Sequence, residues 1–560
     1  MIDRSYSTSW IHQGYLEPHA VVAQPGVRPG QVTVYTSTQG QYTVRSEVSR
    51  ALGLRERDVR VEPMTVGGGF GAKYGIIDAL VAAVALHLRR PVRMVLSRSE
   101  DMLTTMPAPG TAFRVRIGAD AEGHITALDV RAVIENGVFQ FGHAGIIATV
   151  MGGMYRCENV RIEALEVLTH RAPTGAYRAP GVPQALFALE SSVDELARAL
   201  GHDPLELRYL NAVEAGDLTG TGQPWPDIGL KACLERAREH PIWRDRAERP
   251  NEGVGLAAGG WPGAFSPAGA VCRVEPDGTV RLHVGSVDIS GVHSSMVLIA
   301  ADTLGVDPDV VEIVQGTTDS GPFAPGSGGS QVTISLSGAV LDATTQVRDQ
   351  LIDLAALKFE AHREDVELVG GQARLKGVPG TAFTLGELAQ IGQRLAGGPG
   401  PVVAEGRASI KAGAPGFTVQ LIRVHVDPHT GQVTPLEAVS VQDVGFALNP
   451  MLVEGQMQGG TAQGVSIGLY EGMHFAGGSL TNANFLEYVF PRAADLPPIE
   501  AVIVEHPSEH GPFGARIVGE PPITAGAAAV ANAVRDATGI RVSELPVTSE
   551  ALWKLMQARA

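Results

Sequence analysis

Apolar positions along the first part of the chain alternate between helical and extended spacing and lead into a glycine-rich loop. The apolar residues of 41–52 fall on one face of a predicted helix, which Gly53 ends as a left-handed cap. A short apolar run at 59–61 predicts a strand. The loop 67–71 follows at once, so this stretch predicts a helix–strand–glycine loop unit.

Two further apolar runs extend this part of the chain. Asp78 is placed to cap a buried helix over 79–88, and the apolar run 92–96 predicts a buried strand. A long helix is predicted over the residues 182–200, with Gly201 closing it.

The same order of elements returns later in the sequence. A helix at 296–304 ends at Gly305, a strand at 310–314 follows, and a glycine-serine loop lies at 326–330. Helix–glycine–strand order is common by itself, but the second loop favours an internal duplication of α+β units. Two glycine loops facing one cleft would suit a large ligand that carries a pyrophosphate.

The length of 560 residues predicts more than one core-forming unit. The segment 240–253 is charged, contains two prolines and lacks apolar periodicity, which is typical of a linker. We therefore predict two parts, 1–240 and 253–560.

Charge and composition exclude several classes of protein. A formal net charge of −16 opposes extended contact with nucleic acid or an anionic membrane. The apolar stretch 79–86 is far shorter than the roughly 20 residues of a membrane span. Residues 1–5 form no apolar signal region, so we expect a cytoplasmic protein.

Cysteine and histidine usage argues against a side-chain metal centre. The three cysteines, Cys157, Cys233 and Cys272, are far apart, and a [2Fe–2S] cluster usually takes four. His12, His19 and the other histidines, including His293, lack metal-ligand spacing and are interpreted as structural. Any redox chemistry must pass its electrons to another chain or to a soluble acceptor.

The loop Gly67–Lys73 (GGGFGAK) matches neither a P-loop nor a dinucleotide-binding fingerprint. It resembles the first cofactor loop of the molybdenum-binding subunit of xanthine dehydrogenases, aldehyde oxidoreductases and carbon monoxide dehydrogenases. Four further segments resemble that family in its order: Gly14–His19, Gly175–Gln184, Glu454–Gly464, and Val518–Pro522 followed by Ala531–Ala533. The resemblance runs from about Tyr6 to Leu552.

This resemblance implies an α+β fold with two elongated molybdenum-cofactor-binding domains and the cofactor at their interface. The metal is then held by the dithiolene of a pterin, expected as molybdopterin cytosine dinucleotide, and by no side chain directly. The positions that match cofactor-binding residues of the family are Gly68, Gly69, Phe70, Gly71, Arg208, Ser290, Gly291, Gly329, Ser330 and Gln463.

Glu520 is the predicted catalytic base. A glutamate before two prolines is often a plain loop residue, but a proline holds the residue before it extended, and Gly519 permits close approach. A carboxylate fixed in an apolar stretch has a shifted pKa and can act as a general base. The resemblance gives Glu520 that role.

Other polar residues have both a functional and a structural interpretation. Arg178, in a rigid loop of small residues, either stabilises negative charge on substrate or forms a structural ion pair. Arg208 matches a family position near the cofactor phosphates, with a structural ion pair as the alternative. Gln463 can pair with pterin edges through its donor and its acceptor. Gln13 lies near the family's position for a glutamine beside the metal.

Two departures from the family pattern are visible. The family's large subunit usually begins with a smaller α/β hammerhead domain, which we expect on a partner chain if it is present. Ser290 stands where the family often has a glutamine that lies between two glycines and contacts the cofactor.

The implied reaction is hydroxylation with water-derived oxygen, with electrons leaving to iron–sulfur and FAD partner subunits. The arginine loop lacks the cysteine that binds copper in carbon monoxide dehydrogenases. Tyr74 replaces a glutamate of xanthine enzymes. We therefore predict an aldehyde or N-heterocycle as substrate, lined by Tyr74, Trp261 and Phe265.

Two alternatives remain at this point. One is a reductive dehydroxylase of an aromatic acyl-CoA. The other is a cofactor-free, non-catalytic assembly subunit, which Ser290 and the absent front domain favour and which the intact Glu520 opposes.

Overall fold

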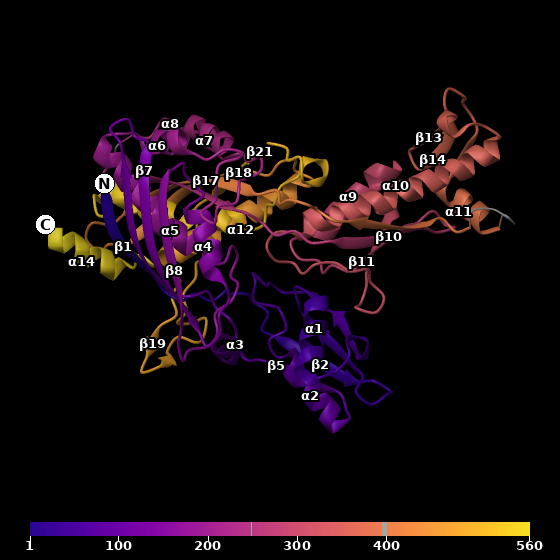
Figure 1. Cartoon of the computed structure of the whole chain (residues 1–560), viewed down its shortest axis with the longest axis horizontal. Helices are drawn as coiled ribbons and strands as arrows, with labels where there is room; N and C mark the ends of the chain where they lie inside the picture. The colour runs from indigo at the N-terminus through magenta and orange to yellow at the C-terminus, as the bar shows by residue number, and fades with distance from the viewer. Residues whose placement is uncertain (248, 395–399, 560) are drawn as a thin grey trace.

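The computed structural model describes residues 1–247, 249–394 and 400–559. Figure 1 shows an elongated molecule with a large body that contains both chain ends, a small lobe around α1 and α2, and an arm built around α9, α10 and α11. No helix among these residues is both long and apolar enough to cross a membrane.

The first half of the chain supplies four strands of a long sheet, to which β22 from the end of the chain adds a fifth, and the small lobe is inserted between β1 and β6. The long sheet has the order β22-β1-β6-β7-β8 and the lobe has the order β4-β3-β2-β5. In chain order the elements are β1 (Ile2–Thr8), β2 (Ala20–Pro25), β3 (Val32–Thr36), α1 (Gln41–Leu52), β4 (Val59–Pro63), α2 (Asp78–Leu88), β5 (Val92–Val95), α3 (Arg98–Thr104), β6 (Thr111–Ala119), β7 (Ile125–Gly137), α4 (His143–Met151), β8 (Asn159–Leu168) and α5 (Val182–Leu200).

Short helices connect this half to a second long sheet of order β21-β18-β17-β9, into which the arm is inserted. The elements are α6 (Pro204–Asn211), α7 (Leu230–Glu239), α8 (Pro241–Arg244), β9 (Glu252–Trp261), β10 (Ala268–Val274), β11 (Val280–Val284), α9 (Val292–Leu304), β12 (Val311–Gln315), α10 (Val332–Phe359), β13 (Val366–Val369), β14 (Gln372–Leu375), β15 (Ala382–Thr384), α11 (Leu385–Arg394), β16 (Val403–Ala408), β17 (Gly416–Val426), β18 (Val433–Asp443), α12 (Pro450–Leu469), β19 (Phe475–Ala476), β20 (Ser479–Leu480), β21 (Ile499–Val504), α13 (Gly526–Thr538), β22 (Glu544–Leu545) and α14 (Ser549–Arg559).

The two halves have the same topology. The lobe order β4-β3-β2-β5 matches the arm order β12-β11-β10-β16, with the same parallel and antiparallel pairings. The long sheets also match, since β1, β6, β7 and β8 pair in the same directions as β9, β17, β18 and β21. The predicted duplication is therefore confirmed and covers both halves, so that α5 of the first repeat corresponds to α13 of the second.

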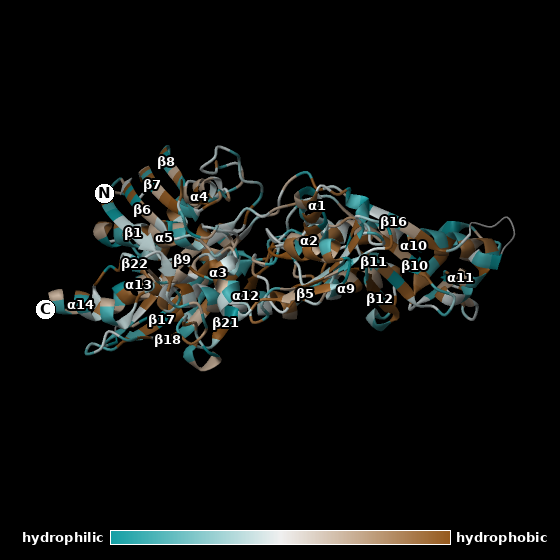
Figure 2. Cartoon of the chain, turned by 90° about the horizontal axis from the view of Figure 1, so that it is seen from below, coloured by the Kyte–Doolittle hydropathy of each residue, from teal (hydrophilic) through white to brown (hydrophobic). Residues whose placement is uncertain are grey.

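Strand burial explains how the first long sheet packs. Phe113, Val115 and Ile117 of β6 face inward, whereas the arginines between them face solvent. The same alternation gives β6, β7 and β8 their brown and teal stripes in Figure 2. Helix α5 covers the apolar face, where Phe187 packs edge-on against Tyr6.

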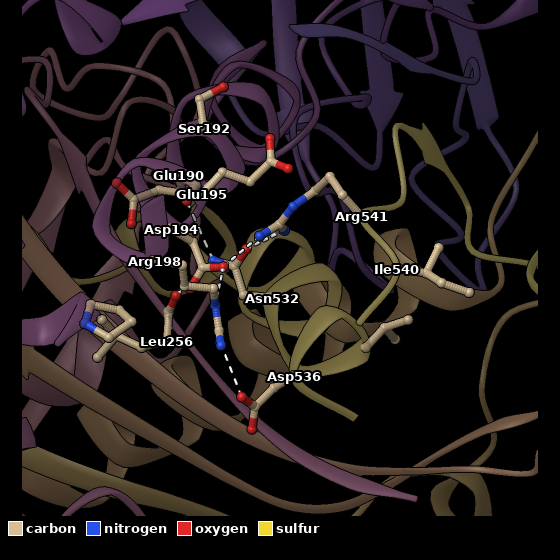
Figure 3. Close-up of polar contacts among 12 residues, drawn as sticks. Glu190, Ser192, Asp194, Glu195, Arg198, Leu256, Asn532, Asp536, Ile540 and Arg541 are labelled. Atoms are coloured by element: carbon tan, nitrogen blue, oxygen red, sulfur yellow. Dashed lines mark hydrogen bonds and ion pairs between the residues drawn. The ribbon is translucent and has the colours of Figure 1, made fainter. Parts of the chain in front are cut away.

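Helices α5 and α13 join the repeats through a buried polar network, drawn in Figure 3. Arg541 donates to the Asn532 side chain at 2.6 Å and pairs with Asp194 of α5. Asn532 donates in turn to the Leu256 carbonyl of β9 at 2.8 Å. The main hydrophobic core likewise contains residues of both repeats, so 240–253 does not separate two independent cores.

Local sequence signals predicted several element boundaries correctly. Gly53, Gly201 and Gly305 each adopt a left-handed conformation directly after α1, α5 and α9. Two details were wrong. Asp78 lies inside α2, where Ile77 takes the cap position without a side-chain hydrogen bond, and β5 is half exposed because it is the edge strand of the lobe.

Candidate active site

Glu520 lies in the loop between β21 and α13, where both of its carboxylate oxygens accept hydrogen bonds. The Ser330 hydroxyl donates to Oε2 at 2.7 Å, and the Ala179 backbone N–H donates to Oε1 at 3.1 Å. Burial raises the pKa of Glu520, and the two donors oppose that rise by stabilising the charged form. The result is a fixed carboxylate with an increased proton affinity, which suits a general base.

Backbone strain gathers in the loops that the sequence predicted to form the site. Phe70, Ala179, Ser290 and Ser330 all have positive φ, between 52° and 66°. Residues with a Cβ rarely adopt this conformation, and it costs free energy. All four belong to segments that the sequence predicted to form the site.

Arg178 connects the arginine loop to the Glu520 loop and to α12. Its Nε donates to the Gly519 carbonyl at 2.6 Å, Nη1 to Gln463 Oε1 at 2.8 Å, and Nη2 to the Gln456 carbonyl at 2.8 Å. Burial lowers the pKa of Arg178 to about 10, so it stays a cation at neutral pH. A planar guanidinium that bonds in three directions holds Glu520 at a fixed distance from α12.

Gln39 connects the two glycine loops and was missed by the sequence reasoning. Its Oε1 accepts from the Gly71 and Lys73 backbones at 3.0 and 3.2 Å, and its Nε2 donates to the Ser327 carbonyl at 2.5 Å. Gln39 precedes α1 as Ser290 precedes α9, so a comparison of the repeats could have found it. Ser290 itself is exposed.

The predicted pocket residues lie at different distances from this centre. Tyr74 packs against Gly326 and Gly328, where a Cβ would collide with its ring and its hydroxyl, respectively. Burial and the charge of Glu520 raise the pKa of Tyr74. Trp261 lies near Glu520, and its buried indole N–H has no acceptor at hydrogen-bond distance in the described part of the chain. Phe265 is exposed on the loop after β9.

Two other predicted residues support the surrounding structure. Arg208 is fully buried and donates to Glu190 Oε2 at 2.7 Å, so the ion pair that the sequence left open is present. Glu190 also accepts from the Ala258 backbone at 2.7 Å. The Gln13 side chain donates to the Ala176 carbonyl at 2.7 Å and so helps to hold the arginine loop in place.

A glycine-lined surface lies beside Arg178 on α12. Gly455, Gly459 and Gln463 follow one another at four-residue spacing on one helix face. A Cβ at Gly455 would meet no described atom within 4 Å, and at Gly459 the first would be Arg178 Nη1 at 3.8 Å. This surface therefore leaves room for a ligand beside Arg178.

Residues 1–247, 249–394 and 400–559 contain no group of three His, Cys, Asp or Glu side chains able to hold a metal ion.

Comparisons with known proteins agree with this arrangement. Models of the molybdopterin cofactor-binding domain match residues 1–212 and 232–497. The putative xanthine dehydrogenase molybdenum-binding subunit of Escherichia coli K12 is 31% identical over 94% of this chain and 73% of its own length. The aldehyde oxidoreductase molybdenum-binding subunit of Escherichia coli O157:H7 is 30% identical over 98% and 75%.

Among solved structures, quinoline 2-oxidoreductase from Pseudomonas putida 86 superposes with a TM-score of 0.90 at 25% identity. The match covers 99% of this chain and 76% of that chain.

Proposed function

We propose that this chain, which belongs to the xanthine dehydrogenase, aldehyde oxidoreductase and carbon monoxide dehydrogenase family of molybdenum-binding catalytic subunits, hydroxylates an electron-poor carbon of an aldehyde or N-heterocycle. The observation that carries this proposal is the Glu520 carboxylate, held by two hydrogen bonds beside a glycine-lined surface.

The cofactor would lie between the two repeats. Gly68–Gly71 and Gly329 would approach it with bare backbone, Ser290 and Gly291 would meet it at the start of α9, and Gln463 would reach it from α12. When bound, a molybdenum pterin, proposed as the cytosine dinucleotide, supplies the oxygen-transfer and redox chemistry. Arg208 stays outside this set because Glu190 satisfies it in the core.

The protein's own groups would handle proton transfer and orientation. Glu520 accepts the proton that water-derived oxygen must lose before it attacks carbon. Arg178 fixes the Glu520 loop against α12, so the base keeps its position during turnover. Tyr74 and Trp261 narrow the space around the carboxylate and limit access of water.

Two features support the substrate class. The loop Tyr177–Pro180 has no cysteine to bind copper, which argues against carbon monoxide. Tyr74 places a neutral phenol near Glu520 where xanthine enzymes have a carboxylate, which favours substrates without a purine's polar edge.

The electrons would leave through partner subunits that carry [2Fe–2S] and FAD. This chain has three cysteines, and Cys233 and Cys272 are buried singly in the core. A soluble, cytoplasmic complex is the corresponding proposal for localisation.

The test is to purify the complex from a host that makes the cofactor. We expect about one molybdenum per copy of this chain, and turnover of aldehydes or N-heterocycles with a dye as acceptor. Reduction of an aromatic acyl-CoA without such turnover would select the dehydroxylase alternative. A folded complex without molybdenum would select the assembly subunit.

A further inference from the structure

The two hydrogen bonds to Glu520 share an unusual origin. Ala179 and Ser330, which donate to its two oxygens, both have left-handed backbones, at φ 59° and 58°. They come from opposite repeats, Ala179 from the loop before α5 and Ser330 from the loop before α10. Strain at both contacts indicates that the surrounding structure is built to hold this carboxylate.

Ser330 has a backbone conformation that glycine would adopt at lower cost. The same loop already has glycine at Gly326, Gly328 and Gly329, so a further glycine at position 330 would suit its composition. A serine at φ 58° destabilises the backbone relative to glycine. Its hydroxyl donates to Glu520 Oε2 at 2.7 Å, a contact that glycine could not make.

We propose that Ser330 is a positioning residue that orients the Glu520 carboxylate and keeps it ionised, in addition to its predicted place in the second cofactor loop. This inference rests on the proposed function, because orientation matters only if Glu520 is the base. It assigns to the second repeat's glycine loop a role toward the catalytic base itself.

The groups around Glu520 leave Ser330 well suited to a test. Arg178 donates to the Gly519 carbonyl and not to the carboxylate, and Tyr74 is a neutral phenol. The Trp261 indole N–H has no acceptor at hydrogen-bond distance among the described residues, and Ala179 contributes a backbone N–H that only a proline would remove. Truncating Ser330 therefore removes one donor without breaking another loop contact.

The sign of the expected effect follows from the hydrogen bond. The donor stabilises the charged carboxylate, so its loss raises the pKa of Glu520 further. More of the base is then protonated at a given acidic pH. In Ser330→Ala we expect the acid limb of kcat/KM to move up by about one pH unit. Well above that limb, we expect kcat to fall by less than about tenfold.

Three variants separate positioning from structure. Ser330→Thr keeps the hydroxyl and is expected to keep the limb near its wild-type place. Ser330→Gly relieves the backbone but loses the hydroxyl, so the limb moves while Tm does not fall. Ser337→Ala is the matched control, because Ser337 lies on α10, which follows the Ser330 loop, and its hydroxyl donates to the Ile334 carbonyl; it is expected to leave the limb unchanged.

A second readout needs no cofactor. Infrared titration of the cofactor-free chain follows the protonated carboxyl band of Glu520, assigned by its loss in Glu520→Gln. The band is expected to persist to higher pH in Ser330→Ala. A titration that does not move overturns the role of Ser330 and leaves Glu520 as the base. If the titration moves while Glu520→Gln turns over normally, the proposed function and the catalytic role of Ser330 both fail.

Discussion

The two repeats share one topology but bring different chemistry to the same place. The loop before α5 carries Arg178, and the equivalent loop before α13 carries Glu520. Because α5 packs against α13, the two loops meet, and Arg178 donates to the Gly519 carbonyl. The duplicated fold brings two equivalent loops together. The two copies differ in the residues of these loops, so that one supplies a cation and the other a base.

A second difference lies before α1 and α9. Gln39 of the first repeat bonds to both glycine loops, whereas Ser290 of the second is exposed. The two equivalent positions therefore differ in role: Gln39 holds the glycine loops together, and Ser290 faces solvent.

The largest effect is expected from Glu520→Gln, which removes the base that the second repeat supplies. The amide keeps the shape but cannot accept a proton, so we expect kcat to fall by roughly 10²–10⁴ or more at unchanged molybdenum content. In the wild type, burial raises the pKa of Glu520, so activity disappears as pH falls through that pKa. Glu509→Gln, an exposed change on the same segment, is the control. Turnover within a few-fold of wild type would reject the assigned base.

Arg178→Lys tests whether the cation of the first repeat acts by position. Lysine keeps the charge but cannot reach three acceptors in fixed directions. We expect kcat to fall roughly 10–100-fold through misplacement of Glu520, with lower cofactor retention. Steady-state kinetics and molybdenum analysis check this. A lysine variant with wild-type kcat would show that charge alone suffices.

Gln39→Ala tests the second difference between the repeats, that between Gln39 and Ser290. Its loss frees the backbone of Gly71 and Lys73 from their acceptor, so we expect the first loop to loosen and cofactor retention to fall several-fold. Ser290→Ala is the counterpart in the other repeat and is expected to change retention by less. Cofactor release during dialysis gives the measurement, and a larger effect at Ser290 would reverse the division of roles.

Arg541→Ala tests the joint between the repeats and has the smallest expected effect on catalysis. The substitution removes one of the two arginines that pair with buried Asp194 and leaves only Arg198, which destabilises the fold. We expect Tm to fall by a few degrees, with kcat per bound molybdenum unchanged. Arg492→Ala, at a largely exposed pair, is expected to leave Tm in place. An unchanged Tm in Arg541→Ala would mean that the network of Figure 3 does not hold α5 to α13.

Part of the fold could be predicted from sequence because its causes are local. Glycine after α1, α5 and α9 ends each helix by adopting a conformation that other residues avoid. The error at β5 arose because strands distant in sequence decide which strand lies at the edge of a sheet. At Asp78 the predicted boundary was off by one residue, since α2 begins at Asp78 and Ile77 takes the cap position.

By itself the sequence determined the family, the order of the five motifs and the candidate base, because those depend on residue type and spacing. Only the tertiary structure decided which of these side chains meet. It placed Arg178 on Gly519 and Gln463, paired Arg208 with Glu190, and brought Gln39 between the loops. These contacts join residues as far apart as 341 positions, and their geometry depends on the packing of two repeats that no local pattern specifies.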